Sequence, residues 1–188
     1  MHRLPRVLLL SIAILLVSTP LHAVTLFKAT LTGSQETPPN ASPATGTAFL
    51  TVNDALTQFI VNETFSGLIG GGVTGAHIHA GPVGVAGPII FDFIPAGFPT
   101  GVTSGSYTHT FTAADLIPRP AVGVNTFSDA INAIFAGNTY FNIHNATFPA
   151  GEIRGQILPT PEPASALLLG VGILMFGVGW NRKNLFGV

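Results

Sequence analysis

The sequence predicts an all-β domain that lies between two apolar terminal segments. Between residues 24 and 158, short runs of Thr, Val, Ile and Phe alternate with clusters of Gly, Pro and Asn. No stretch there keeps the helical apolar period of about 3.6 residues. Isolated hairpins would leave their apolar faces in water, so we expect a β-sandwich of the Greek-key type. The apolar ends predict an N-terminal signal peptide and a C-terminal transmembrane helix.

Residues 1–23 have the layout of a secretory signal peptide. Arg3 and Arg6 give a positive start, and residues 7–17 are apolar apart from one serine. This run is close to the roughly 10 residues of a signal-peptide core and well below the roughly 20 of a membrane-spanning helix. We therefore expect cleavage after Ala23, with an uncleaved membrane anchor as the alternative.

Residues 24–158 have a length that suits one domain with a single core. They contain three basic and seven acidic side chains, which gives a net charge of −4. Because no basic patch is present to neutralise phosphates, nucleic acid is not an expected partner. The chain has no cysteine, so without disulfides the fold is expected to depend on core packing, with a metal ion as the alternative source of stability.

Runs rich in β-branched and aromatic residues, each bounded by turn residues, mark the predicted strands. These strands cover residues 25–32, 46–53, 58–65, 73–79, 89–93, 105–111, 139–144 and 152–158. Residues 115–116 and 128–135 are predicted helical turns, the second with Ser128 as its N-cap. Residues 67–75 are a glycine-rich loop.

Histidines gather on one predicted strand face. Side chains alternate across a strand, so His77 and His79 point to one face while Ile78 points to the other. The same parity places Asn142 and His144 on one face of their strand. If these strands are neighbours with their apolar sides inward, the polar side collects the imidazoles and the amide.

The last predicted strand adds charged groups to this polar face, because Glu152, Arg154 and Gln156 alternate along it. A register that pairs His144 with Glu152 or with Arg154 keeps the polar sets together. Glu152 and Arg154 would then form an ion pair that braces the sheet. Glu36, which precedes two prolines, is expected to accept backbone N–H groups or to reach Arg154.

Four ordered motifs make this domain similar to the CHRD domain, a family named from chordin. They are LTGSQETPP at 31–39, ATGTA at 44–48, GAHIH at 75–79 with Gly-Pro at 81–82, and YFNIH at 140–144 followed by PAGEIRGQ at 149–156. The resemblance implies an extracellular all-β domain over residues 24–158. The family has no established biochemical activity, and chordin itself is an extracellular antagonist of growth factors.

Two interpretations of His77, His79 and His144 are open. Imidazoles on one sheet face suit Cu(II) or Zn(II), with Glu36 or Glu152 as an auxiliary oxygen donor. Alternatively, the rings are structural and hydrogen-bond loop carbonyls or these carboxylates, so that no cofactor is required.

Catalysis is not expected from this sequence. It contains no Gly-x-Ser-x-Gly elbow and no thiol nucleophile. His109 lies in a threonine-rich run and is expected to be a solvated strand residue. We therefore predict that the protein is not an enzyme.

The C-terminal segment resembles the PEP-CTERM protein-sorting signal of Gram-negative bacteria. Pro161, Glu162 and Pro163 precede an apolar run at 164–180, and two basic residues follow at 182–183. The run is just long enough to span a bilayer, and the basic residues favour an outward-facing domain. The resemblance implies recognition by an exosortase-type processing enzyme, and a plain C-terminal membrane anchor is the alternative.

These patterns predict an exported protein whose sorting signal covers residues 159–188. The chain would be held transiently at the inner membrane and then delivered to the outer envelope or extracellular matrix. A non-enzymatic binding or structural role is expected, with a polysaccharide or another protein as ligand. The alternative is a metal-binding β-sandwich domain that uses His77, His79 and His144.

Overall fold

The structure is a computed structural model that describes residues 25–160. The strands within these residues are β1 (Thr25–Thr32), β2 (Thr45–Val52), β3 (Gln58–Ser66), β4 (Val73–Ala80), β5 (Ile89–Asp92), β6 (Gly105–Thr112), β7 (Thr139–Asn145), β8 (Ile153–Gln156) and β9 (Leu158–Pro159). The helices are α1 (Phe127–Phe135) and three 3-10 helices, η1 (Gly33–Gln35), η2 (Ala113–Asp115) and η3 (Pro120–Val122). The predicted all-β class is confirmed.

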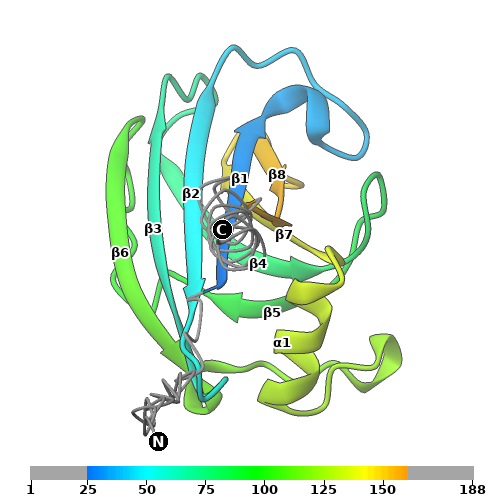
Figure 1. The fold of residues 1–188 in the computed structure, drawn as a ribbon. Helices are drawn as coiled ribbons and strands as arrows, with labels where there is room; N and C mark the ends of the chain where they lie inside the picture. The colour runs from blue at the N-terminus through cyan, green and yellow to red at the C-terminus, as the bar shows by residue number, and fades with distance from the viewer. Residues whose placement is uncertain (1–24, 161–188) are drawn as a thin grey trace, which may run out of the picture.

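All nine strands belong to one antiparallel sheet that curls over on itself (Figure 1). Its order is β5-β4-β7-β8-β1-β2-β3-β6, and β9 pairs with β1. We call β1, β2, β3 and β6 the first limb and β5, β4, β7 and β8 the second limb. The strands of the two limbs cross each other in Figure 1, and their apolar faces enclose the core.

The predicted Greek-key sandwich of two separate sheets is not observed. The limbs are continuous because β8 pairs with β7 on one side and with β1 on the other, at Thr32 and Arg154. Gly155 permits this close approach, since a Cβ there would lie 2.8 Å from the carbonyl oxygen of Thr30. The chain thus achieves face-to-face packing by bending one sheet.

Phenylalanine rings fill the space between the limbs. Phe59 on β3 meets Phe91 on β5 edge to face, with ring centroids 5.0 Å apart, and Phe93 meets Phe111 on β6 at 4.9 Å. Phe127 of α1 stacks on Phe59 at 5.8 Å, which places the helix against the core. Each such pair contributes about 0.5–1.5 kcal/mol beyond the area it buries. Phe91 on β5 also meets Phe111 on β6 at 5.5 Å, so the two outer strands of the sheet are held together by aromatic packing.

Helix α1 begins one residue earlier than expected, and Ser128 is not its N-cap. Thr126 caps the helix instead, because its hydroxyl accepts from the backbone N–H of Asp129 while the Asp129 carboxylate accepts from the backbone N–H of Thr126. This reciprocal capping box satisfies the backbone N–H groups of both Thr126 and Asp129.

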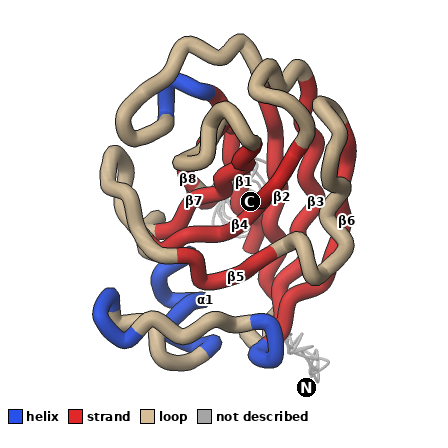
Figure 2. The backbone as a smooth tube through the Cα atoms, turned by 180° about the vertical axis from the view of Figure 1, so that it is seen from behind, coloured by secondary structure: helices blue, strands red, loops and turns tan. Residues whose placement is uncertain are grey.

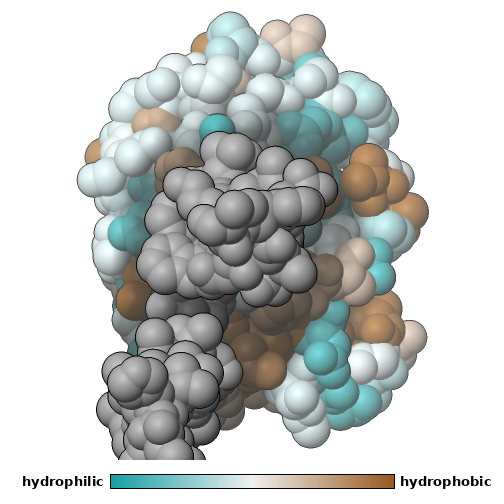
Figure 3. All heavy atoms as spheres, in the orientation of Figure 1, coloured by the Kyte–Doolittle hydropathy of each residue, from teal (hydrophilic) through white to brown (hydrophobic). Residues whose placement is uncertain are grey.

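The surface in Figure 3 is mostly hydrophilic or neutral, with apolar side chains exposed near α1. Exposed apolar residues there include Phe135 at the end of α1 and Leu158 on β9. No helix within residues 25–160 is long and apolar enough to cross a membrane. The predicted signal peptide at 1–23 and transmembrane helix at 164–180 lie outside the described residues.

A carboxyl group lies inside the aromatic core. Glu63 on β3 is 2 % exposed, and neither of its carboxyl oxygens has a hydrogen-bond partner. Opposite it on β6 is Tyr107, whose hydroxyl is also buried without a partner. Burial raises the pKa of Glu63 from 4.5 to about 8, so the group is mainly protonated at neutral pH.

The stability of the Glu63→Gln variant, relative to that of the natural protein, is expected to increase as the pH rises. The unfolded chain ionises this carboxyl near pH 4.5, whereas the folded protein keeps it protonated up to about pH 8. Between these values the natural protein should lose about 1.4 kcal/mol of unfolding free energy per pH unit relative to Glu63→Gln. Denaturant unfolding at several pH values in this window measures the difference, with exposed Asp54→Asn as control. A difference that does not change with pH would contradict the assignment.

Candidate metal centre

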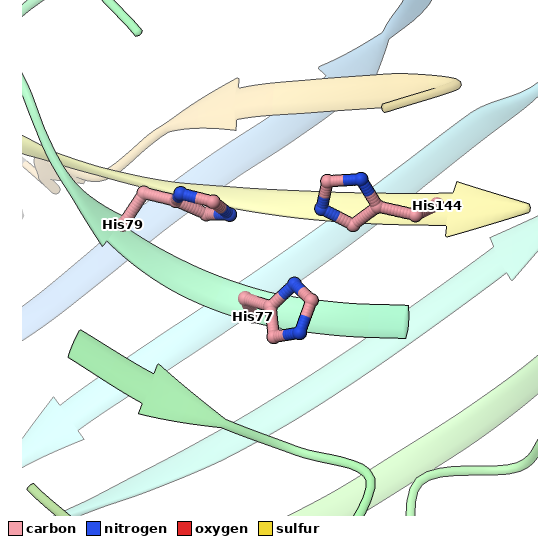
Figure 4. A group of neighbouring side chains, drawn as sticks. All are labelled: His77, His79 and His144. Atoms are coloured by element: carbon pink, nitrogen blue, oxygen red, sulfur yellow. The ribbon is translucent and has the colours of Figure 1, made fainter. Parts of the chain in front are cut away.

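Three histidines meet on the face of the second limb that points away from the core. His77 and His79 lie on β4 and His144 lies on β7. One ring nitrogen of each belongs to a group whose members all lie within 4.8 Å of one another (Figure 4). His144 is opposite Gly75 in the β4–β7 register, and a Cβ at Gly75 would lie 2.9 Å from Cε1 of His77. Glycine at this position gives the three rings room to converge.

Backbone carbonyls of two loops orient two of the rings. His79 Nδ1 lies 2.8 Å from the carbonyl oxygen of Gly87, and His144 Nδ1 lies 3.1 Å from that of Pro149. A carbonyl oxygen only accepts, so Nδ1 carries the proton in both neutral rings and Nε2 keeps its lone pair. Metal-binding histidines typically donate their other ring N–H to a carbonyl or carboxylate in this way.

The third ring has a carboxylate in the equivalent place. His77 Nε2 lies 3.6 Å from Oδ1 of Asp92, its neighbour in register on β5. The remaining nitrogens, His77 Nδ1, His79 Nε2 and His144 Nε2, are buried without a hydrogen-bond partner. Each unpaired buried polar atom costs about 1–3 kcal/mol. Three such nitrogens lie together, and a group that accepts electron pairs would satisfy all of them.

Burial keeps this cluster uncharged. It lowers the pKa of His79 to about 4, although the hydrogen bond to Gly87 acts in the opposite direction. Burial, together with the nearby His77, also lowers the pKa of His144 to about 4. The pKa of His77 is lowered by burial as well, against the attraction of Asp92. At neutral pH the three imidazoles therefore offer free lone pairs, the form that binds metal ions.

Arg154 on β8 fixes the loops that border the cluster. It is 2 % exposed, and its guanidinium donates hydrogen bonds to four oxygens. These are Thr37 Oγ1 at 3.1 Å, Val85 O at 3.1 Å, Pro82 O at 2.9 Å and Gln156 Oε1 at 3.2 Å. Pro82 and Val85 belong to the loop between β4 and β5, and Thr37 to the loop between β1 and β2. One buried side chain thus holds both loops. Figure 2 shows the backbone of these loops beside the second limb.

Tyr140 connects Arg154 to the histidines. Arg154 Cζ lies 3.4 Å from the centroid of the Tyr140 ring, and His79 stacks on this ring at 4.9 Å with an interplanar angle of 8°. The Tyr140 hydroxyl accepts a hydrogen bond from the backbone N–H of Gly87 at 3.0 Å. Only glycine fits at position 87, because a Cβ there would lie 1.6 Å from the carbonyl oxygen of Ala80.

Glu36 and Asn142, both predicted members of the polar face, are brought together. They are 6 % and 4 % exposed, and Asn142 Nδ2 donates to Glu36 Oε2 at 3.2 Å. Burial raises the pKa of Glu36 to about 7, against the opposing effects of Asn142 and of the Arg154 charge. Glu36 therefore pairs with an amide rather than with Arg154.

The expected ion pair between Glu152 and Arg154 is not formed. Within residues 25–160, the only pairing of a basic with an acidic side chain joins His77 and Asp92. Glu152 precedes β8, and its carboxylate accepts hydrogen bonds from Ser42 Oγ, Ile69 N, Gly70 N and Asn145 Nδ2. Because these bonds occupy both carboxyl oxygens, Glu152 tethers loops and is not a free oxygen donor.

Two contributors to the site were missed in the sequence. Tyr140 shares its strand parity with Asn142 and His144, which is a usable signal. Asp92 ends a four-residue strand paired through a bulge, so its position opposite His77 could not be read from alternation. His109 lies on β6, is partly exposed and is outside the cluster.

The fold and the site together define an all-β domain with a histidine-lined polar face. A family model described as the CHRD domain matches residues 27–157, so the chain belongs to the CHRD domain family. A second model, described as the PEP-CTERM protein-sorting motif, matches residues 159–183. Comparisons with curated proteins and with solved structures gave no match. Both resemblances predicted from the sequence are confirmed.

The sorting motif marks an exported, envelope-targeted protein and implies processing by exosortase-type machinery. Its residues Pro161, Glu162 and Pro163 follow the last described residue, Thr160. The cleavage events at the two ends therefore stay predictions.

Arg154→Lys is expected to destabilise the domain, because an ammonium group cannot reproduce the planar fork that reaches two loops. Each hydrogen bond to a charged group contributes about 1.5–3 kcal/mol, so we expect a loss of roughly 3 kcal/mol or more. Denaturant unfolding of the purified protein measures it. Arg119→Lys is the matched control, since Arg119 makes one such bond, from Nε to the carbonyl oxygen of Ile89. Equal losses in the two variants would contradict the role given to Arg154.

Proposed function

We propose that this exported CHRD protein has a non-enzymatic binding role at the cell surface or in the extracellular matrix, and that its domain binds one Cu(II) or Zn(II) ion. His77, His79 and His144 are the ligands. The observation that supports this most directly is the set of three buried, unpartnered ring nitrogens that lie together. A purely structural role for the rings would leave these nitrogens unsatisfied.

The spacing of the nitrogens suits an ion after a small closure. Ring nitrogens that bind one Zn(II) ion at about 2.0–2.1 Å lie no more than about 4.2 Å apart. The observed spread of up to 4.8 Å is slightly larger, so the rings would move inward around the ion. Imidazole is a good ligand for both copper and zinc, and either ion fits this donor set.

The binding role extends to a macromolecular ligand. The sorting motif supports this proposal, because a protein sent to the envelope would meet polysaccharides and other envelope proteins. The surface loops held by Arg154 are the part of the domain best suited to such contacts, because loops on a rigid scaffold commonly carry recognition.

Metal analysis tests the ligand assignment. The purified protein, reconstituted with Cu(II) or Zn(II) and freed of excess ion, should retain one equivalent and melt at a higher temperature. His144→Ala should weaken binding by more than the roughly 10–100-fold that loss of an outer hydrogen-bond partner costs. His109→Ala, which removes a histidine outside the cluster, should have no effect. Retention of less than about a tenth of an equivalent, with unchanged melting, would eliminate the metal site.

Intact-mass measurement and cell fractionation test the proposed processing and location of the protein. The mature protein should lack residues 1–23 and the segment that follows the sorting motif. Changing Pro161, Glu162 and Pro163 to alanine should leave the C-terminal segment attached and keep the protein at the inner membrane. Pro95→Ala, an exposed change within the domain, is the control. If deletion of residues 161–188 left the location unchanged, the proposed route would be wrong.

A further inference from the structure

Two buried oxygen atoms beside the histidines lack hydrogen-bond donors. The Glu36 carboxyl and the Asn142 amide share one hydrogen bond, from Nδ2 to Oε2. The other oxygen of each group, Glu36 Oε1 and Asn142 Oδ1, is buried and has no partner. Both side chains are more than nine-tenths buried. Since buried polar atoms are nearly always satisfied, the pair indicates a missing donor.

The register places these oxygens at the border of the histidine cluster. Asn142 lies directly opposite His77 in the β4–β7 pairing. It also precedes His144 by two residues, so the two side chains lie on the same face of β7. Side chains opposite each other on antiparallel strands have Cβ atoms about 4.5–5.5 Å apart. The amide is therefore a direct neighbour of the imidazoles.

Gly151 lies directly against both oxygens. A Cβ at this position would lie 2.3 Å from Asn142 Oδ1 and 2.5 Å from Glu36 Oε1. Gly151 also has a φ of 130°, a conformation that L side chains rarely adopt. Both steric room and backbone conformation thus require glycine where the two oxygens converge.

The chemistry of these two oxygens favours water over a second cation. Hard cations such as Ca²⁺ take six to eight oxygen ligands, and only two unpartnered oxygens are present. Arg154 lies opposite Asn142 in the β7–β8 register and adds a positive charge that disfavours a further cation. Water supplies two hydrogens for two acceptors, and binding to a metal ion makes it a stronger donor.

We propose that Glu36 and Asn142 accept hydrogen bonds from a water molecule that occupies an exchangeable fourth position on the ion held by the three histidines. This inference rests on the metal site proposed above. The carboxyl and the amide are positioning residues here and do not ligate the ion. The fourth position is thereby open to exchange with small anions.

Pulsed electron paramagnetic resonance of the Cu(II)-loaded protein in D₂O tests the inference. The natural protein should show deuterium coupling from a directly bound water, and azide should abolish it. At pH 8, above the pKa of about 7 of Glu36, Glu36→Gln should retain one equivalent of copper and bind azide at least tenfold more tightly, because the negative charge of the carboxylate beside the incoming anion is removed. Asp115→Asn, a carboxyl change outside the cluster, should leave azide affinity unchanged.

A second variant displaces the two oxygens, because a Cβ at position 151 would clash with both. Gly151→Ala should lose the water coupling while it retains copper on the three histidines, and thermal melting shows whether it folds. If the natural protein binds copper without a coupled water, the inference fails while the metal site stands. If Glu36→Gln loses copper, Glu36 is itself a ligand and the inference also fails. If no copper binds to the natural protein, the proposed metal site fails and the inference fails with it.

Discussion

Burial of one positive charge is the constraint on which the rest of the structure depends. Taking a guanidinium group out of water costs several kcal/mol unless other interactions compensate. Arg154 is compensated by four oxygen acceptors, none of which belongs to a carboxylate, and by the face of Tyr140. The acceptors come from two loops and from its own strand, so satisfying the charge also orders the loops. The charge in turn contributes to the low pKa of His79.

The strands that carry the histidines also build the core. Ile78 and Ile143 point into the aromatic interior, while His77 and His144 point outward from the same two strands. The rings therefore rest on backbone that the core makes rigid. Because β8 joins the limbs, the loop after β1 is brought to Arg154, and a site formed by distant segments has one common support.

Alternation along the strands made part of this arrangement predictable. It placed His77, His79 and His144 on one face, and the observed pairing of Asn142 with Arg154 keeps the polar sets together. Other features give no signal in a single sequence. Loop positions such as Gly87 and Pro149 contribute backbone carbonyls, which every residue has. The continuous sheet depends on the long-range pairing of β8. Glu152 departs from the predicted alternation with Arg154 and Gln156 because β8 starts one residue after it.

The aromatic core and the Arg154 network contain none of the three free ring nitrogens, so the interactions that build the fold do not involve the proposed ion. This distinguishes the domain from small zinc modules that unfold when a chelator removes their metal. Loading of the proposed site would therefore follow folding, in whichever compartment the sheet closes. Occupancy would then rise and fall with the local supply of metal while the scaffold persists.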